Sequence, residues 1–198
     1  MEKEDLQKIR EVLIGTDILV IADEIYAELT YNNKNHVSIS TLPGMKERTI
    51  VLNGFSKAFS MTGWRIGFAV GPTEIIAAMT KIHQLTMLCA PTTGQHAAIA
   101  ALKQGLSNDW KDMRSMIDEY AKRRRYLVDA FNELGLFCNE PEGAFYAFPS
   151  IKSTGLKSEE FCDRLLAHGK VVTVPGTAFG KSGEGHIRCC YATSMRDL

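Results

Sequence analysis

The 198-residue sequence has no excess charge of either sign and no long apolar run. Its 23 basic and 23 acidic residues give a formal net charge of zero, so it indicates neither a nucleic-acid-binding surface nor an acidic disordered tail. The longest apolar run is far too short to cross a bilayer. The first residues, Met-Glu-Lys-Glu-Asp, are acidic and helical in character, unlike a secretory signal. We therefore expect a soluble cytoplasmic protein.

The sequence also lacks a Cys-x-x-Cys pair. Its five cysteines are Cys89, Cys138, Cys162, Cys189 and Cys190, an odd number that does not suit a disulfide framework. Adjacent residues of a strand point to opposite faces, so Cys189 and Cys190 are poorly placed to share a metal ion. The histidines at 36, 83 and 96 form no ligand pattern with a nearby acid. We expect reduced, buried thiols and no metal.

Hydrophobic residues make up 45% of the chain and charged residues 23%, as in a soluble globular protein. Short apolar runs predict buried strands over residues 18–22, 49–53 and 66–70. Three-and-four spacing of apolar residues predicts helices over residues 4–14, from Pro72 to the loop 90–94, and over 95–103. The alternation of strands and helices predicts a layered α/β domain.

A long helix without proline or glycine is expected over residues 109–134. The only basic cluster, Lys122–Arg125, lies in this helix. We interpret it as a solvated helix face, because Asp118 and Glu119 precede it and no aromatic platform accompanies it.

Beyond Gly135 the pattern changes to short strands and one helix. The helix is expected to begin with Ser158 as its N-cap and to end near His168. The strands are expected at residues 145–148, 171–174 and 186–192. We therefore expect three parts: a large domain over residues 1–108, a bridging helix over 109–134 and a small α+β domain over 135–198.

The most informative stretch is Asn53-Gly-Phe-Ser-Lys57-Ala-Phe-Ser-Met-Thr-Gly-Trp-Arg65. It places Lys57 in a loop directly after an expected strand, among small and apolar residues with hydroxyls on both sides. Partial desolvation helps an amine to lose its proton, and a neutral amine can form a Schiff base with a carbonyl. The alternative is an ordinary exposed loop lysine.

A second apolar strand, Ile18–Ala22, leads into Asp23, and Tyr26 follows three residues later. Because α/β folds bind ligands at the carboxyl ends of parallel strands, Asp23 is a candidate site residue. Taken alone, Asp23 could instead be a helix N-cap or a loop acid, and Tyr26 an amphipathic residue at the edge of the core.

The lysine stretch and the Asp-x-x-Tyr stretch together resemble the pyridoxal-phosphate enzymes of the class I and II aminotransferase family (fold type I). The resemblance runs through most of the chain, up to Arg188, and the order and spacing of the two stretches are specific. It implies an α/β fold: a partial, mostly parallel-sheet large domain of the pyridoxal-phosphate transferase type, followed by a small α+β domain.

The resemblance also implies the cofactor, pyridoxal 5'-phosphate, and the residues that hold it. Lys57 is the catalytic residue, which carries the cofactor as a Schiff base and then moves the α-proton of the substrate. Asp23 pairs with the pyridine nitrogen, and Tyr26 donates a hydrogen bond to the phenolic oxygen. Ser56 and Arg65 are candidates for the phosphate, because a hydroxyl and a guanidinium fork suit a dianion.

Arg188, in the stretch His186-Ile-Arg-Cys-Cys-Tyr-Ala-Thr-Ser194, matches the family arginine that binds the α-carboxylate of the substrate. It is expected in mid-strand between apolar neighbours, where an unpaired charge is costly. A bidentate carboxylate would offset that cost, and the alternative is an internal salt bridge. The stretches 143–146 and 174–180 also resemble family segments, the first lining the substrate side and the second supplying a turn.

We therefore expect an aminotransferase that moves an amino group between an α-amino acid and a 2-oxo acid, of the aspartate or aromatic type by resemblance. Two alternatives share these residues. One is a carbon–sulfur lyase or related amino acid enzyme that uses pyridoxal phosphate. The other is the ligand-sensing aminotransferase-like domain of a transcription regulator. For the chain itself we expect small-molecule substrates and neither a nucleic acid nor a membrane partner.

Compared with the family, the sequence looks shortened at both ends, so we expect a fragment. It would lack the upstream phosphate-binding turn, the aromatic residue that stacks on the cofactor and the asparagine near the phenolic oxygen. Such a fragment is expected to bind pyridoxal phosphate weakly or not at all. Family members are dimers, and we expect the full-length protein to be a homodimer that associates near Pro91 and through the helix after Pro72.

Overall fold

The computed structural model describes residues 1–32 and 34–198, which divide into two compact units, Met1–Met113 and Arg114–Leu198. Unit 1 contains α1 (Lys3–Leu13), β1 (Val20–Asp23), β2 (Thr49–Gly54), β3 (Gly67–Val70), α2 (Thr73–Thr86) and α3 (Thr92–Ser107). The long helix α4 (Lys111–Glu133) begins at the end of unit 1. Unit 2 continues with β4 (Tyr146–Ala147), α5 (Ser158–Arg164), β5 (Val174–Pro175) and β6 (Ile187–Cys190). The predicted division at residues 108 and 134 stays a prediction.

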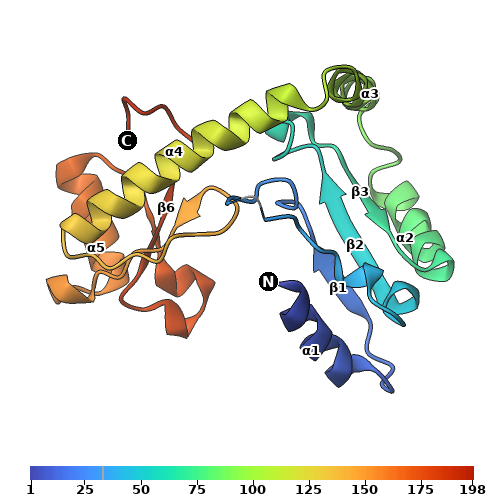
Figure 1. The fold of residues 1–198 in the computed structure, drawn as a ribbon, viewed down its shortest axis with the longest axis horizontal. Coiled ribbons are helices and arrows are strands. Elements are labelled where there is room, and N and C mark those ends of the chain that lie inside the picture. Colours follow the sequence, from blue (N-terminus) through green and yellow to red (C-terminus); the bar gives the residue numbers. More distant parts are fainter. Residues whose placement is uncertain (33) are drawn as a thin grey trace. The chain divides into compact units, whose positions relative to one another are not determined.

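The sheet of unit 1 has the strand order β1–β2–β3 (Figure 1). β1 runs parallel to β2, with Val20 opposite Thr49, and β3 runs antiparallel to β2. A parallel pair needs a long connection, whereas an antiparallel neighbour can return directly. The long connection is the chain between β1 and β2, and the direct return is the loop that carries Lys57. The α/β class predicted from the sequence is confirmed, and the sheet is mixed.

A hydrophobic cluster joins α1 to the segment before β2. Its buried members are Leu6, Ile39, Leu42 and Met45. Val20 and Ala22 of β1 pack against this cluster, so the cluster anchors the strand that ends at Asp23. Arg48 closes the other end of α1, because its Nη1 donates a hydrogen bond to the carbonyl oxygen of Leu13 at 2.7 Å.

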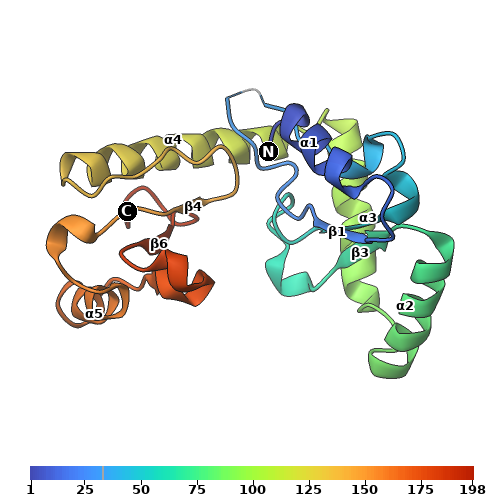
Figure 2. The ribbon, with the colours of Figure 1, turned by 90° about the horizontal axis from the view of Figure 1, so that it is seen from below.

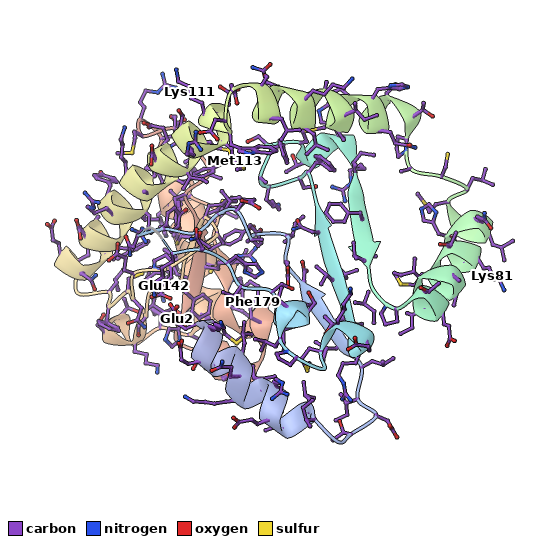
Figure 3. All side chains as sticks on the ribbon, turned by 45° about the vertical axis from the view of Figure 1, so that its right-hand side comes forward. Glu2, Lys81, Lys111, Met113, Glu142 and Phe179 are labelled. Carbon is purple, nitrogen blue, oxygen red and sulfur yellow. The ribbon has the colours of Figure 1, made fainter. Side chains whose placement is uncertain are left out.

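The helix α2 has apolar side chains that are exposed to solvent. It lies beyond β3, on the side away from β1 (Figures 1 and 2), and none of its residues is buried. Ile82 is 64% exposed and Leu85 is 89% exposed. The side chains of α2, with Lys81 labelled, are visible at one edge of Figure 3. An apolar face of this kind is typical of an interaction surface.

The helix α3 meets the rest of unit 1 through glycines. A Cβ atom on Gly94 would lie 2.6 Å from Cγ1 of Ile66 and 2.9 Å from the carbonyl oxygen of Trp64. At its other end, Gly105 packs on the ring of Trp110. Glycine is therefore required at Gly94 by close approach rather than by backbone conformation.

The sheet of unit 2 is antiparallel, with the order β4–β6–β5. Tyr146 lies opposite Cys190, and Val174 lies opposite Arg188. Its strands are shorter than the sequence predicts, and an isolated bridge between Ser150 and His186 extends the pairing. A core cluster of three buried residues lies beneath the sheet and α5: Ile151, Cys162 and Ile187.

One member of the basic cluster on α4 is buried. Arg124 is 1% exposed, its Nη1 donates to the carbonyl oxygen of Pro141 at 2.8 Å, and its Nη2 lies 2.9 Å from Oε1 of Glu140. The interpretation of Lys122–Arg125 as a solvated face is therefore wrong for this residue. Arg124 holds α4 to the loop that follows it.

The predicted role of Ser158 as a helix cap is also wrong. Ser158 is the first residue of α5, and the N-cap position belongs to Lys157. The buried hydroxyl of Ser158 accepts hydrogen bonds from the backbone N–H of Gly185 at 2.9 Å and of His186 at 3.3 Å. It therefore ties α5 to the segment before β6. The helix continues as a π-helical turn, Leu165–Gly169.

All five cysteines are free thiols. Cys138 and Cys162 are buried, whereas Cys89 and Cys190 are exposed, so the expectation of buried thiols is wrong for the last two. In the part of the chain that the structure describes, no His, Cys, Asp and Glu side chains gather into a metal-binding group. No helix in that part has both the length and the apolarity to span a bilayer.

Candidate functional site

The carboxyl ends of the parallel strands β1 and β2 carry the residues that the sequence singles out. Asp23 is the last residue of β1 and is exposed. Its Oδ1 accepts a hydrogen bond from the backbone N–H of Ile25 at 3.2 Å. The backbone N–H of Glu24 donates to the carbonyl oxygen of Leu52 at 2.8 Å, which holds the end of β1 against β2. Asp23 thus has a local turn role and also presents a carboxylate at this edge of the sheet.

Lys57 and Tyr26 lie in contact at the same edge. The Nζ atom of Lys57 is 5.7 Å from the centre of the Tyr26 ring, within the range of a cation–π interaction. Both residues are half-buried. The structure therefore brings the proposed lysine and tyrosine together, although Lys57 is 31 positions further along the chain (57 − 26). An isolated exposed loop lysine would not have this contact.

The lysine loop is held by tight packing at its two ends. A Cβ atom on Gly54 would lie 2.8 Å from the carbonyl oxygen of Ile66 and 2.9 Å from Cα of Gly67. The backbone N–H of Phe55 donates to the same carbonyl of Ile66 at 3.1 Å. Ala58, next to the lysine, is buried. Lys57 therefore projects from a compact loop whose ends are fixed by β2 and β3.

The two proposed phosphate residues have different settings. Arg65 is exposed and has a left-handed backbone, with φ of 54°. Its Nη1 donates to the carbonyl oxygen of Thr62 at 2.8 Å, so the guanidinium is turned toward its own loop. Ser56 is half-buried beside Lys57. Phe59 packs on Phe55, with ring centres 5.2 Å apart.

An aromatic cavity lies behind the lysine loop. Its volume is about 380 Å³. It is lined by Glu28, Asn53, Gly54, Phe55, Ala58, Phe59, Phe68, Leu102, Trp110 and Met113. Trp64, near the end of the same loop, is 47% exposed.

Arg188 lies in unit 2, on β6, between two aromatic rings. Its Cζ atom is 4.4 Å from the centre of the Tyr146 ring and 4.6 Å from the centre of the Phe179 ring. Arg188 forms no ion pair with a carboxylate of the described residues, so the internal salt bridge considered above is not observed. The stretches 143–146 and 174–180, which resemble family segments, contain these two rings, but the sequence did not place either ring against Arg188.

Knowledge of the strand register would have identified one of these rings. Tyr146 lies opposite Cys190 in the β4–β6 pairing, which makes it a diagonal neighbour of Arg188 on the same face. The sequence shows the aromatic residue in the stretch 143–146, but it does not give the register. Phe179, labelled in Figure 3, comes from the turn after β5, where no pairing rule applies.

The next residue on β6 is a thiol in an apolar setting. Burial raises the pKa of the Cys189 thiol to about 12, and the neighbouring thiols of Cys138 and Cys162 act in the same direction. Cys189 therefore stays protonated beside Arg188 at neutral pH. In the segment before β6, hydrogen bonds from the backbone N–H groups of Ser158 and Gly185 lower the pKa of Glu184.

The donor set of unit 1 fits pyridoxal 5'-phosphate. The cofactor has an aldehyde, a ring nitrogen, a phenolic oxygen and a phosphate. Unit 1 offers an amine on Lys57, a carboxylate on Asp23, a phenol on Tyr26, and a hydroxyl and a guanidinium on Ser56 and Arg65. Asp23, Tyr26 and Lys57 meet at one edge of the sheet through the β1–β2 pairing and the Lys57–Tyr26 contact.

Comparison with known proteins gives a consistent result. The model of the family "Aminotransferase class I and II" matches residues 1–198. YugH of Bacillus subtilis (strain 168) is 55% identical over 99% of this chain and 50% of its own length. An aspartate aminotransferase of Pyrococcus abyssi (strain GE5 / Orsay) is 46% identical over 100% of this chain and 50% of its own length. The chain thus spans about half the length of these relatives.

Solved structures give the same result. A crystal structure of an aromatic aminotransferase from Pyrococcus horikoshii OT3 superimposes with a TM-score of 0.93 and 45% identity, covering 98% of this chain and 52% of that one. A Thermus thermophilus aspartate aminotransferase double mutant has a TM-score of 0.89 and 34% identity, covering 99% of this chain and 50% of that one.

Proposed function

The chain belongs to the class I and II aminotransferase family, and on that premise we propose that its function is amino-group transfer between an α-amino acid and a 2-oxo acid, with pyridoxal 5'-phosphate as cofactor. The observation that carries the proposal is the contact between Lys57 and Tyr26, with 5.7 Å between Nζ and the ring centre. It joins an amine and a phenol at the carboxyl edge of a parallel strand pair, beside Asp23. That edge is where α/β folds bind their ligands.

Each residue has a role that follows from its chemistry. When bound, pyridoxal 5'-phosphate supplies an electron sink for the charge that develops at the substrate's α-carbon. The Nζ amine of Lys57 would hold the cofactor by condensing with its aldehyde, with loss of water, and once free this amine would accept the α-proton of the substrate. Asp23 holds the proton on the ring nitrogen, because a carboxylate stabilises the charged form of a nearby base.

The remaining residues bind and orient. Tyr26 donates its hydroxyl hydrogen to the phenolic oxygen of the cofactor. Ser56 and Arg65 bind the phosphate through one hydroxyl and one guanidinium, and Arg65 must turn from the carbonyl of Thr62 to do so. Arg188 binds the α-carboxylate of the substrate through paired N–H groups.

The relatives favour a substrate class. The Pyrococcus abyssi relative is named an aspartate aminotransferase, and the Pyrococcus horikoshii structure is titled an aromatic aminotransferase. We therefore assign the aspartate or aromatic type to this chain within the proposed function. The proposal includes a homodimer of the full-length protein in the cytoplasm, which the exposed apolar face of α2 and the loop near Pro91 support.

Borohydride trapping tests the role of Lys57. The chain is incubated with an excess of pyridoxal phosphate, reduced with borohydride, digested and mapped by mass spectrometry. An excess of cofactor allows for weak binding. The added mass is expected on Lys57 in preference to the other lysines, because its Nζ lies 5.7 Å from the centre of the Tyr26 ring at the carboxyl ends of β1 and β2. Lys57→Arg is the matched control, since it keeps the charge and removes the primary amine.

An even distribution of label over the surface lysines, unchanged in Lys57→Arg, would contradict the proposal. A product assay separates the enzymatic alternatives when cofactor is bound. Release of a 2-oxo acid with transfer of nitrogen to a second oxo acid indicates an aminotransferase. Release of a thiol indicates a carbon–sulfur lyase, and ligand binding without turnover indicates a sensor domain.

A further inference from the structure

The guanidinium carbon of Arg188 lies over two aromatic rings within cation–π distance. Two aromatic rings lie 4.4 Å and 4.6 Å from its Cζ atom, those of Tyr146 and Phe179. The five N–H donors of a guanidinium lie in its plane, away from the faces on which rings stack. None of the Arg188 nitrogens is a buried atom without a partner, and no ion pair with a described carboxylate occupies them. The donors therefore remain accessible to a ligand.

One ring comes from β4, which pairs with β6, and the other comes from the turn that follows β5, the second strand paired with β6. Tyr146 belongs to β4 and is the diagonal neighbour of Arg188, and Phe179 ends the 3-10 turn that follows β5. Val174 of β5 lies opposite Arg188 itself. Both neighbours of β6 thus deliver an aromatic ring to the same guanidinium, which two unrelated surface contacts would not do.

A second pair of rings supports Phe179. Phe148 meets it edge to face, with ring centres 6.1 Å apart and an angle of 76°. His186 stacks on Phe148 at 5.3 Å, with the rings 6° from parallel. Phe179 is 51% exposed and Phe148 is 40% exposed, so burial in a core does not explain their arrangement. Phe179 therefore contacts a second aromatic ring in addition to the guanidinium of Arg188.

We propose that Tyr146 and Phe179 are positioning residues that fix the plane of the Arg188 guanidinium, so that its N–H edge meets a carboxylate in bidentate geometry. This inference rests on the proposed function, in which that carboxylate belongs to the amino acid substrate. A flexible arginine would lose much of the benefit of bidentate binding, because its rotamer freedom must be given up on binding. The two rings remove that freedom before the ligand arrives.

The test measures the motion of the guanidinium directly. The experiment uses the full 198-residue chain. NMR of the arginine Nε–H and Nη–H groups measures the rate of rotation about the Nε–Cζ bond of Arg188. The Arg188 resonances are assigned from their loss in Arg188→Gln. Removing one ring face in Phe179→Leu is expected to increase this rate about 10-fold, because a stacking interaction of this kind is lost. Tyr146→Leu is expected to do the same, whereas Tyr146→Phe keeps the ring and leaves the rate unchanged. Phe137→Leu is the matched control, because Phe137 is an exposed phenylalanine of the same unit, 65% accessible.

Maleate then serves as the carboxylate probe, followed through the Arg188 resonance. Its dissociation constant is expected to rise about 10-fold in Phe179→Leu and to be unchanged in Phe137→Leu. If Phe179→Leu alters neither the rotation rate nor maleate affinity by more than about twofold, the positioning role is wrong. If rotation is slow in the wild-type chain and becomes fast in Phe179→Leu, the positioning role is supported, whether or not maleate shifts the Arg188 resonance. If maleate does not shift the Arg188 resonance, the result counts against the carboxylate-binding role of Arg188 in the proposed function.

Discussion

Arg124 and Glu140 form an ion pair in which one partner is fully buried and the other half in solvent. The Nη2 and Oε1 atoms are 2.9 Å apart, and the side chains are 1% and 51% exposed, respectively. The same guanidinium donates to the carbonyl oxygen of Pro141 at 2.8 Å. A single side chain on α4 thus organises the loop that leads from the helix to β4.

Replacing Arg124 by methionine is expected to lower the free energy of unfolding by about 2 kcal/mol. The substitution keeps much of the buried volume but leaves the Pro141 carbonyl without its charged donor, and such losses cost about 1–3 kcal/mol. Urea unfolding followed by circular dichroism measures the change. Arg125→Met is the control, because Arg125 is exposed, and it should alter stability by no more than about 0.5 kcal/mol. Equal effects of the two substitutions would contradict the structural role of Arg124.

Adding a methyl group at Gly94 is expected to destabilise unit 1. The new Cβ would lie 2.6 Å from Cγ1 of Ile66 and 2.9 Å from a backbone oxygen, and the second contact cannot be relieved by a rotamer change. Overpacking of this kind costs about 1–3 kcal/mol, which exceeds the gain of about 1 kcal/mol from the better helix propensity of alanine. Thermal unfolding of Gly94→Ala measures the net loss. Gly63→Ala has no atom within 4 Å of the new methyl group and should not lower the melting temperature.

The half-buried thiol of Cys189 predicts a loss of stability at alkaline pH. Its pKa is raised from 9.0 to about 12 in the folded chain, so the folded state keeps a proton that the unfolded state releases. Its contribution is fully present below pH 9, and it is lost as the pH rises from 9 toward 12. The slope is at most about 1.4 kcal/mol per pH unit. Urea unfolding at pH 8.0 and 10.5 measures it.

Cys189→Ala should unfold with a weaker pH dependence across that range. Cys190→Ala is the matched control, because Cys190 is the exposed neighbour, and it should retain the wild-type slope. The same slope in all three proteins would show that other groups cause it.

The apolar face of α2 predicts self-association. Leu85 of α2 is 89% exposed, and Leu88, two residues beyond the end of the helix, is 80% exposed. A charge at either position opposes the burial of that face in an interface. Leu85→Glu is therefore expected to shift a concentration-dependent dimer toward monomer in sedimentation equilibrium. Gln84→Glu adds the same charge at an exposed polar position of α2 and should leave the dimer intact. A wild-type chain that stays monomeric at high concentration would contradict this role of α2.

The sequence was sufficient to predict most elements of the fold. Apolar runs identify β1, β2 and β3 within two residues, but the expectation that these strands are buried is wrong for β1 and β3, in which Ile21 and Val70 are exposed. The helices α1 and α4 are predicted by spacing, and their ends lie close to glycine. The resemblance to the aminotransferase family identified Lys57 and Tyr26, and the structure shows them in contact.

Contacts between residues that are far apart in the sequence could not be predicted. The burial of Arg124 requires the loop at Pro141 to fold back on α4, and no local pattern encodes that return. The sequence pattern for a helix cap at Ser158 is genuine, but a tertiary contact with Gly185 takes the hydroxyl instead. The approach of Tyr146 to Arg188 depends on strand register, which a two-residue strand specifies only through its neighbours.

The strand order of unit 1 has a consequence for how the chain must be handled. In the described part of the chain, β1 and β3 each have a strand on one side only, and both carry exposed apolar side chains, with Ile21 70% and Val70 59% accessible. An edge strand has unpaired backbone N–H and C=O groups that can pair with a strand of another chain. A sheet with two such edge strands can be extended in both directions. Protein that aggregates at high concentration or on warming is therefore expected to form ordered cross-β fibrils rather than an amorphous precipitate.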